Sequence, residues 1–156
     1  MTPADSPSSV LPPTTTREHV FPAHPRQVGA ALSRTALREQ VLPAGHDQVG
    51  VARAFISAML AACPAAELCV SELATNAVLH SASRNPGGTF TVRAAIFDDH
   101  VRIEVEDNGG TWDEHPRSDS RPHGLDIVRE LAADCGRDGS PLTGWVAWAR
   151  LEWRST

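Results

Sequence analysis

The pattern of apolar positions predicts a long helix in the middle of the chain. These positions recur every three or four residues, at Ala66, Val70, Leu73 and Ala77. Such spacing is typical of a helix with one face toward a core, so we expect a helix over residues 65–80. Pro64 suits its first turn, where the missing N–H leaves no hydrogen bond unmade. The same helix would carry an exposed polar stripe at Glu67, Ser71 and Thr75.

Alternating apolar residues predict a two-stranded hairpin after this helix. The first strand would cover residues 90–96 and the second residues 101–106, with a turn at Asp98-Asp99 between them. In both segments every second residue is apolar, as expected for strands with one face on a core. The hairpin would place Asp107 at a strand end.

Three further elements are predicted around this centre. A helix over residues 53–60 precedes it, and a strand over residues 144–153 ends the domain. A further helix would lie between the hairpin and the last strand. One of its faces would be formed by Leu125, Val128, Leu131, Ala132 and Cys135. Gly136 can end that helix. Val146 and Trp148 make the second face of the last strand apolar too, so we expect a partner, a loop or the N-terminal extension to cover it.

The N-terminal part of the chain differs in composition from the rest. Residues 1–16 are rich in Pro, Ser and Thr, which predicts a disordered tail. The segment from Phe21 resembles the segment from Leu42, but only the second leads directly into a clear helix. We therefore expect an N-terminal extension over residues 1–36 and a single domain over residues 37–156.

Composition and charge exclude several classes of binding site and of protein. The net charge of −5 gives no indication of binding to nucleic acid or to an anionic membrane. The chain contains no lysine, which excludes a Walker A site. It has no apolar run of membrane-spanning length and no signal-peptide pattern, so we expect a cytoplasmic protein. The three cysteines lack a CxxC pair and the seven histidines lack metal-ligand spacing, so we expect reduced thiols and no zinc site.

Glu72 and Asn76 lie one helical turn apart, beside apolar neighbours of the predicted helix. Burying a carboxylate or an amide without partners is costly, and a divalent metal with a phosphate would supply partners. Asn76 can offer an oxygen to magnesium, and Glu72 could act as the base for a hydroxyl or water that attacks a γ-phosphate. The alternatives are that Glu72 is simply exposed or pairs with an arginine.

Two glycine-containing segments complete a nucleotide site. Asp107 could accept a hydrogen bond from the exocyclic amine of adenine, and Gly109 and Gly110 let the backbone approach a ring or adopt positive φ. His123, Gly124 and Leu125 would open a helix whose free N–H groups face phosphates. The polar residues 110–121 between the segments have the length of a mobile lid. The alternative for residues 107–110 is a plain turn.

In this order, the motifs resemble those of the GHKL ATPases, which include gyrase, histidine kinases and MutL. Residues 71–78 and 123–128 are especially similar to the short bacterial anti-sigma-factor serine kinases. The resemblance covers residues 39–153. It implies an α+β fold, a two-layer α/β sandwich of the GHKL (Bergerat) type, with a mixed, mostly antiparallel sheet and helices on one face.

The resemblance also implies a ligand and partners. It implies ATP with magnesium, Glu72 as catalytic residue, and Asn76 as metal ligand. Nucleotide contacts would come from Asn76, Asp107, Gly109, Gly110, His123, Gly124 and Leu125. Members of this class bind a sigma factor, phosphorylate a serine or threonine of a small antagonist protein, and often form a homodimer.

Two positions depart from the family pattern. Pro122 replaces the first glycine of Gly-x-Gly-Leu and has no N–H for a phosphate. The order Thr143-Gly144 reverses the usual Gly-Thr, so Thr143 is not expected beside the base. These departures leave an alternative open: a regulator that holds a protein partner, with weak or no nucleotide binding and no phosphotransfer. A structural domain without a ligand would leave Glu72 and Asn76 unexplained.

Overall fold

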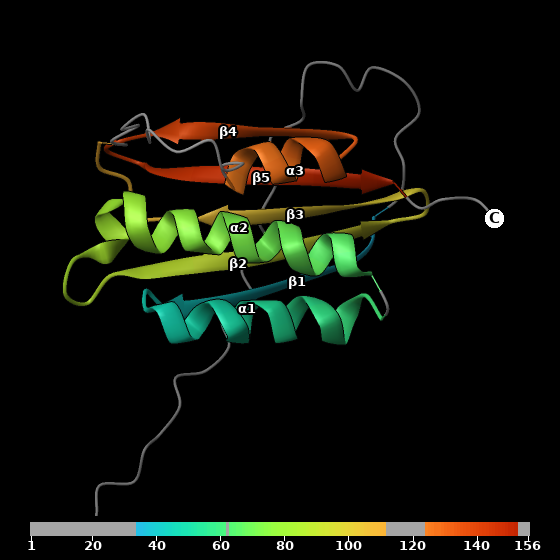
Figure 1. Cartoon of the computed structure of the whole chain (residues 1–156), viewed down its shortest axis with the longest axis horizontal. Coiled ribbons are helices and arrows are strands. Elements are labelled where there is room, and N and C mark those ends of the chain that lie inside the picture. The colour runs from blue at the N-terminus through green and yellow to red at the C-terminus, as the bar shows by residue number, and fades with distance from the viewer. Residues whose placement is uncertain (1–33, 62, 112–123, 153–156) are drawn as a thin grey trace, which may run out of the picture.

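The computed structural model describes residues 34–61, 63–111 and 124–152. The described elements are β1 (Arg34–Pro43), α1 (His46–Met59), α2 (Pro64–His80), the 3-10 helix η1 (Ala82–Arg84), β2 (Thr89–Phe97), β3 (His100–Glu106), α3 (Gly124–Leu131), β4 (Asp134–Ser140) and β5 (Gly144–Glu152). Figure 1 shows α1, α2 and α3 on one side of the strands. None of the helices in the described segments is long and apolar enough to cross a membrane.

The strands form one sheet in the order β1-β2-β3-β5-β4. The predicted fold class, an α+β two-layer sandwich with helices on one face, is confirmed (Figure 1). The expectation of a mixed sheet is wrong for the described strands, because every neighbouring pair is antiparallel. β3 and β4 run in the same direction, but β5 lies between them and opposes both.

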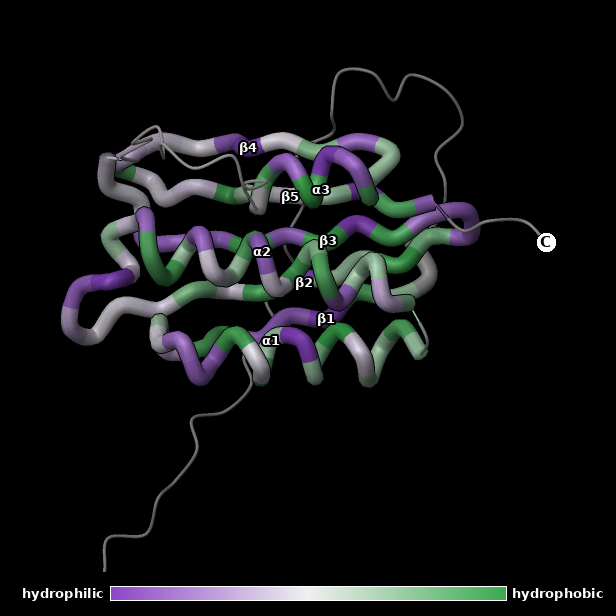
Figure 2. The backbone as a smooth tube through the Cα atoms, viewed as in Figure 1, coloured by the Kyte–Doolittle hydropathy of each residue, from purple (hydrophilic) through white to green (hydrophobic). Residues whose placement is uncertain are grey.

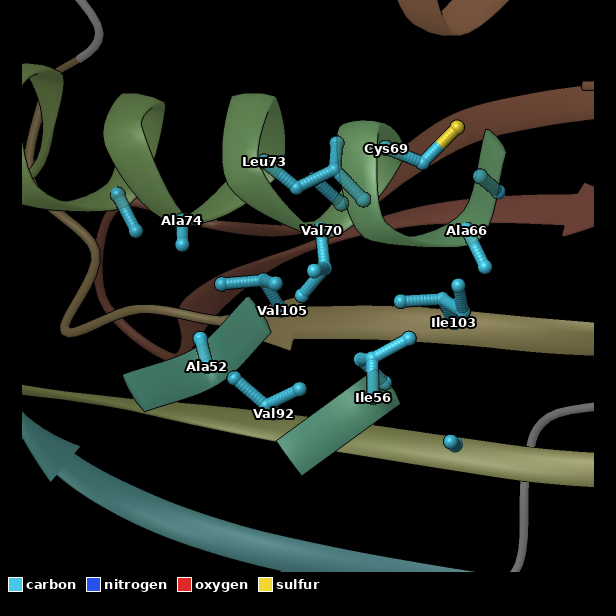
Figure 3. Close-up of a cluster of buried hydrophobic side chains, with 14 of the residues drawn as sticks. Ala52, Ile56, Ala66, Cys69, Val70, Leu73, Ala74, Val92, Ile103 and Val105 are labelled. Atoms are coloured by element: carbon cyan, nitrogen blue, oxygen red, sulfur yellow. The ribbon is translucent and has the colours of Figure 1, made fainter. Parts of the chain in front are cut away.

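The core lies between the sheet and the helices. The predicted apolar face of α2, at Ala66, Val70, Leu73 and Ala77, is buried. Figure 3 shows Val70 and Leu73 beside Val105 of β3, and Ile56 of α1 near Ile103. Burying a side chain the size of Val70 or Leu73 contributes about 1.5–3 kcal/mol, so this face of α2 fixes the helix on the sheet.

Ser71 is not exposed as the polar stripe predicted. It is buried, and its Oγ accepts a hydrogen bond from Arg53 Nε at 2.8 Å. The same hydroxyl donates to the Glu67 carbonyl at 2.8 Å. Packing of α1 against α2 therefore covers this side of the helix, and the serine satisfies its own hydrogen bonds there.

The predicted helix through Cys135 is too long. α3 ends at Leu131, and Cys135 lies in the edge strand β4. β4 contains two glycines and mostly exposed polar residues, so it lacks the apolar alternation that marks a strand; Figure 2 shows it largely purple and pale. Pairing with β5 selects the strand instead, and Gly136 lies where a Cβ would be 2.9 Å from the Trp148 ring.

The three cysteines are free in the structure. Cys69 is buried on α2, where burial raises the pKa of its thiol to about 12. Burial also raises the pKa of the Cys135 thiol. A thiol with a raised pKa is a poor nucleophile near neutral pH, so Cys69 acts as a core residue.

The helix-free face of the sheet carries charged side chains and one indole. Arg93 is buried and pairs with Glu39, Glu106 and Glu104. Burial alone would lower the pKa of Arg93, but the hydrogen bonds to Glu106 and Glu39 raise it above its ordinary value. The arginine therefore stays charged and holds three strands together through side chains.

Trp148 lies on this face, as the alternation predicted, but its ring is only 4% exposed. The Arg102 guanidinium lies 4.2 Å from the ring centroid, and Nε1 donates to Asp138 at 3.2 Å. Side chains of β3 and β4 therefore contact the indole. This face thus does not present Trp148 as an exposed contact for a partner.

Candidate nucleotide site

Glu72 and Asn76 lie one turn apart on α2 and are both half-buried. Neither side chain makes a hydrogen bond or ion pair within residues 34–61, 63–111 and 124–152. No arginine of these segments pairs with Glu72, so the alternative of a simple ion pair has no support there. A carboxylate and an amide in this setting can still receive ligands.

Asp107 follows the last residue of β3 and is 7% exposed. Its Oδ1 accepts hydrogen bonds from Gly109 N at 2.7 Å and from Trp145 N at 3.1 Å. Its own N–H donates to the Trp145 carbonyl at 2.9 Å. Two donors on one oxygen fix the orientation of the carboxylate, which a selective acceptor requires.

Gly109 and Gly110 occupy backbone conformations that side chains disfavour. Their φ angles are +82° and +83°, in the left-handed region. A Cβ at Gly109 would lie 2.4 Å from the Pro141 carbonyl oxygen. Gly109 O accepts from Ala82 N at 2.7 Å, and Gly110 N donates to Pro141 O at 2.9 Å. The turn is therefore fastened to η1 on one side and to the β4–β5 turn on the other.

Ser83 and Asn108 support the same turn, and neither role was predicted from the sequence. Ser83 Oγ accepts from Asn108 N at 2.8 Å and donates to the Thr89 carbonyl at 2.7 Å. Asn108 Oδ1 accepts from Thr89 N at 2.8 Å. These contacts join residues far apart in sequence, so only the fold brings them together.

A cavity of about 290 Å³ opens between α2, α3 and the strands β4 and β5. It is lined by Leu73, Leu125, Val128, Arg129, Cys135, Gly136, Arg137, Ala147 and Trp148. Ala147 pairs with Val105, two residues before Asp107, and Leu73 follows Glu72 directly. The cavity therefore shares α2 with Glu72 and Asn76 and lies next to β3, the strand that ends before Asp107.

Of the predicted glycine box at the third helix, Leu125 lines this cavity and Gly124 begins α3. His123 and Pro122, with residues 112–121 of the predicted lid, lie outside the described residues. Thr143 is exposed in the β4–β5 turn, where its Oγ1 lies 2.8 Å from Ser140 Oγ. Thr143 therefore does not line the cavity, as the reversed Thr-Gly order had indicated.

Trp145 and Arg137 also lie at the candidate site, and neither was predicted there from the sequence. The indole Nε1 donates to the Gly110 carbonyl at 3.0 Å. The Arg137 guanidinium lies 4.4 Å from the indole centroid. The sequence predicted Trp145 only as part of the last strand, over residues 144–153. An aromatic side chain directly after Gly144 is the one signal that could have pointed to the site.

Asn76 suits a magnesium ion that takes most of its ligands from a nucleotide and water, rather than a metal site built from protein side chains alone. The described residues hold no cluster of three or more His, Cys, Asp or Glu that could bind a metal. Magnesium usually takes few protein oxygens and completes its shell with phosphates and water. The half-buried amide of Asn76 would supply such an oxygen when a nucleotide brings the others.

Comparison with known proteins agrees with this arrangement. The family model described as histidine kinase-like ATPase domain matches residues 21–146. The match begins inside the segment 1–36, and the structure shows β1 from Arg34 onward. No curated protein matches the chain.

Proposed function

The chain belongs to the histidine kinase-like ATPase domain family, and from this premise we propose that it binds ATP with magnesium and regulates transcription by phosphotransfer. The role we infer is an anti-sigma factor with serine/threonine kinase activity toward a small antagonist protein. The similarity of residues 71–78 and 123–128 to anti-sigma-factor kinases supports that role. The protein would act in the cytoplasm and without nucleic acid or membrane.

The observation that carries the proposal is the oriented Asp107 carboxylate at the end of β3, the strand next to a cavity with both apolar and cationic walls. Oδ1 is held by two backbone N–H groups, while Leu73, Leu125 and Ala147 provide apolar walls of the cavity. A nucleobase combines a flat apolar body with a few polar edge groups, and such sites bind it well. Asp107 would accept from the exocyclic amine of adenine.

The remaining residues would act on the triphosphate. Asn76 would hold magnesium, which neutralises charge on the phosphates when bound. The first turn of α3, with Gly124 and Leu125, would present N–H groups to phosphate oxygens. Glu72 would take the proton of the attacking serine or threonine hydroxyl, as its oxygen bonds to the γ-phosphorus and ADP leaves.

A second candidate function is a protein-binding regulator with weak or no nucleotide binding. The position of Thr143 favours it, because that hydroxyl faces Ser140 in an exposed turn rather than the cavity. The same surfaces could then bind a sigma factor, an antagonist protein or a second copy of the chain without any phosphotransfer.

Titration calorimetry with ATP and magnesium tests the choice. The leading proposal expects binding by the wild-type protein and weaker, less magnesium-dependent binding by Asn76→Ala. Radiolabel transfer to a candidate antagonist then separates a kinase from an ATP-binding regulator. No heat at millimolar ATP would reject the kinase and leave the protein-binding regulator.

A further inference from the structure

We propose that Arg137, positioned by the indole of Trp145, binds the phosphates of the nucleotide. This inference rests on the proposed function and names a residue of that site which the family motifs do not contain. Charged hydrogen-bond donors bind phosphates strongly, and in a chain without lysine arginine is the side chain best suited to that role.

The position of Trp145 is fixed by the Asp107 turn. Its backbone exchanges two hydrogen bonds with Asp107, and its indole Nε1 donates to the Gly110 carbonyl. The ring is therefore held at the end of β5, next to the proposed base acceptor. A side chain that stacks on this ring therefore also lies close to the proposed nucleotide site.

Arg137 rests on that ring and also lines the cavity. Its guanidinium lies 4.4 Å from the indole centroid, and it comes from β4 opposite Ala147. The same cavity is lined by Leu125, in the first turn of α3. Arg137 and the helix N–H groups proposed for phosphate binding therefore border one space.

Among the described residues, two arginines line the cavity, and their side chains make different contacts. Arg129 pairs with Asp126 at 3.0 Å, and its side chain is 65% exposed. The Arg137 guanidinium lies over the Trp145 ring. Stacking uses the face of a guanidinium and directs its N–H groups outward in the plane, which suits paired hydrogen bonds to phosphate oxygens. This orientation selects Arg137 as the phosphate ligand. Arg38, which is exposed on β1 and does not line the cavity, is the control.

A ligand series tests this role without requiring catalysis. Calorimetry would compare adenosine, AMP, ADP and ATP on the wild type, Arg137→Ala, Arg137→Lys and Arg38→Ala. We expect Arg137→Ala to weaken binding of a phosphorylated ligand roughly 10- to 100-fold, as for a lost charged hydrogen bond, while adenosine binding is unchanged. The first ligand in the series that shows the loss identifies the phosphate that Arg137 contacts.

Two more variants separate phosphate binding from packing. Arg137→Lys should recover part of the loss because it restores charge, whereas Arg38→Ala, on β1, should bind every ligand as the wild type does. Trp145→Leu removes the stacking surface and should reproduce part of the Arg137→Ala loss for ATP, and Trp145→Phe should lose less. Melting temperatures on the same preparations show that each variant is folded.

Several outcomes would overturn the inference. Equal losses for adenosine and ATP would make Arg137 part of the base pocket, and unchanged ATP binding in Arg137→Ala would remove it from the site. In both cases the wild type still binds ATP and the proposed function stands. A wild type that binds neither adenosine nor ATP would reject the proposed function, and this inference with it.

Discussion

Glu72 is half-buried on α2 and makes no hydrogen bond or ion pair to any described residue. If it is the general base, Glu72→Ala should bind ATP like the wild type but transfer phosphate about a hundred- to ten-thousand-fold more slowly. Removal of a half-buried carboxylate that has no partner should not lower the melting temperature. Radiolabel transfer and thermal melts on one preparation measure both, and wild-type transfer would exclude the catalytic role.

Asp107 combines a structural and a recognition role in one carboxylate. In Asp107→Asn, the remaining carbonyl oxygen can still accept from Gly109 and Trp145, so the turn should be retained. The variant loses the ionised acceptor, so we expect weaker ATP binding and a smaller preference for ATP over GTP. Competition calorimetry with the two nucleotides measures the ratio. An unchanged ratio would mean that Asp107 only supports the turn.

At the scale of elements, the Asp107 turn depends on glycine. Gly109→Ala would place a Cβ 2.4 Å from Pro141 O at a φ of +82°, and the conformation alone costs about 1–2 kcal/mol for an L-residue. We expect the free energy of unfolding to fall by at least that amount, with weaker ATP binding. Urea denaturation measures it.

Gly50 provides the matched control for that change. It lies in α1, and a Cβ there would meet nothing within 4 Å. Gly50→Ala should therefore raise the free energy of unfolding by about 0.5–1 kcal/mol, as expected inside a helix. If both substitutions had the same effect, the close approach at Gly109 would not be an energetic constraint.

Edge elements were harder to predict than central ones. α2, β2 and β3 are buried on a regular face, and their apolar periodicity predicted them. β4 and β1 are edge strands with mostly exposed or half-buried residues, so their sequences carry little alternation. β1 begins at Arg34, within the segment expected to be an extension, because pairing with β2 rather than local pattern defines it.

At the scale of the molecule, the candidate site shows what a sequence can and cannot predict. Asp107, Gly109 and Gly110 are adjacent and could be identified together. Trp145 is 38 residues from the Asp107 carboxylate that it binds. The antiparallel register of β3 with β5 brings them together, and no local pattern encodes that register. The ligand motifs were therefore predictable, while their supporting residues were not.

The helix-free face of the sheet also depends on long-range pairing. Glu39 of β1, Arg93 of β2 and Glu104 of β3 lie in one cross-strand row, and Glu106 adds a third carboxylate beside the same arginine. Glu104 is 2% exposed and lies 3.9 Å from Arg93 Nη1. Glu104 also pairs with Arg102 at 2.7 Å, but removal of Arg93 would leave Glu39 and Glu106 without the cation that they share, which is more costly than losing a surface pair.

Arg93→Ala should therefore lower the free energy of unfolding by about 3–5 kcal/mol, the range for breaking a buried ion pair. Arg38 on β1 is the control, since it is exposed and bonds only to its neighbouring Leu37 carbonyl. Arg38→Ala should change the same quantity by less than about 0.5 kcal/mol. Both are measured by urea denaturation. Equal, small effects would show that the three strands are held by backbone pairing and the opposite, apolar face alone, and that the charged row contributes nothing to stability.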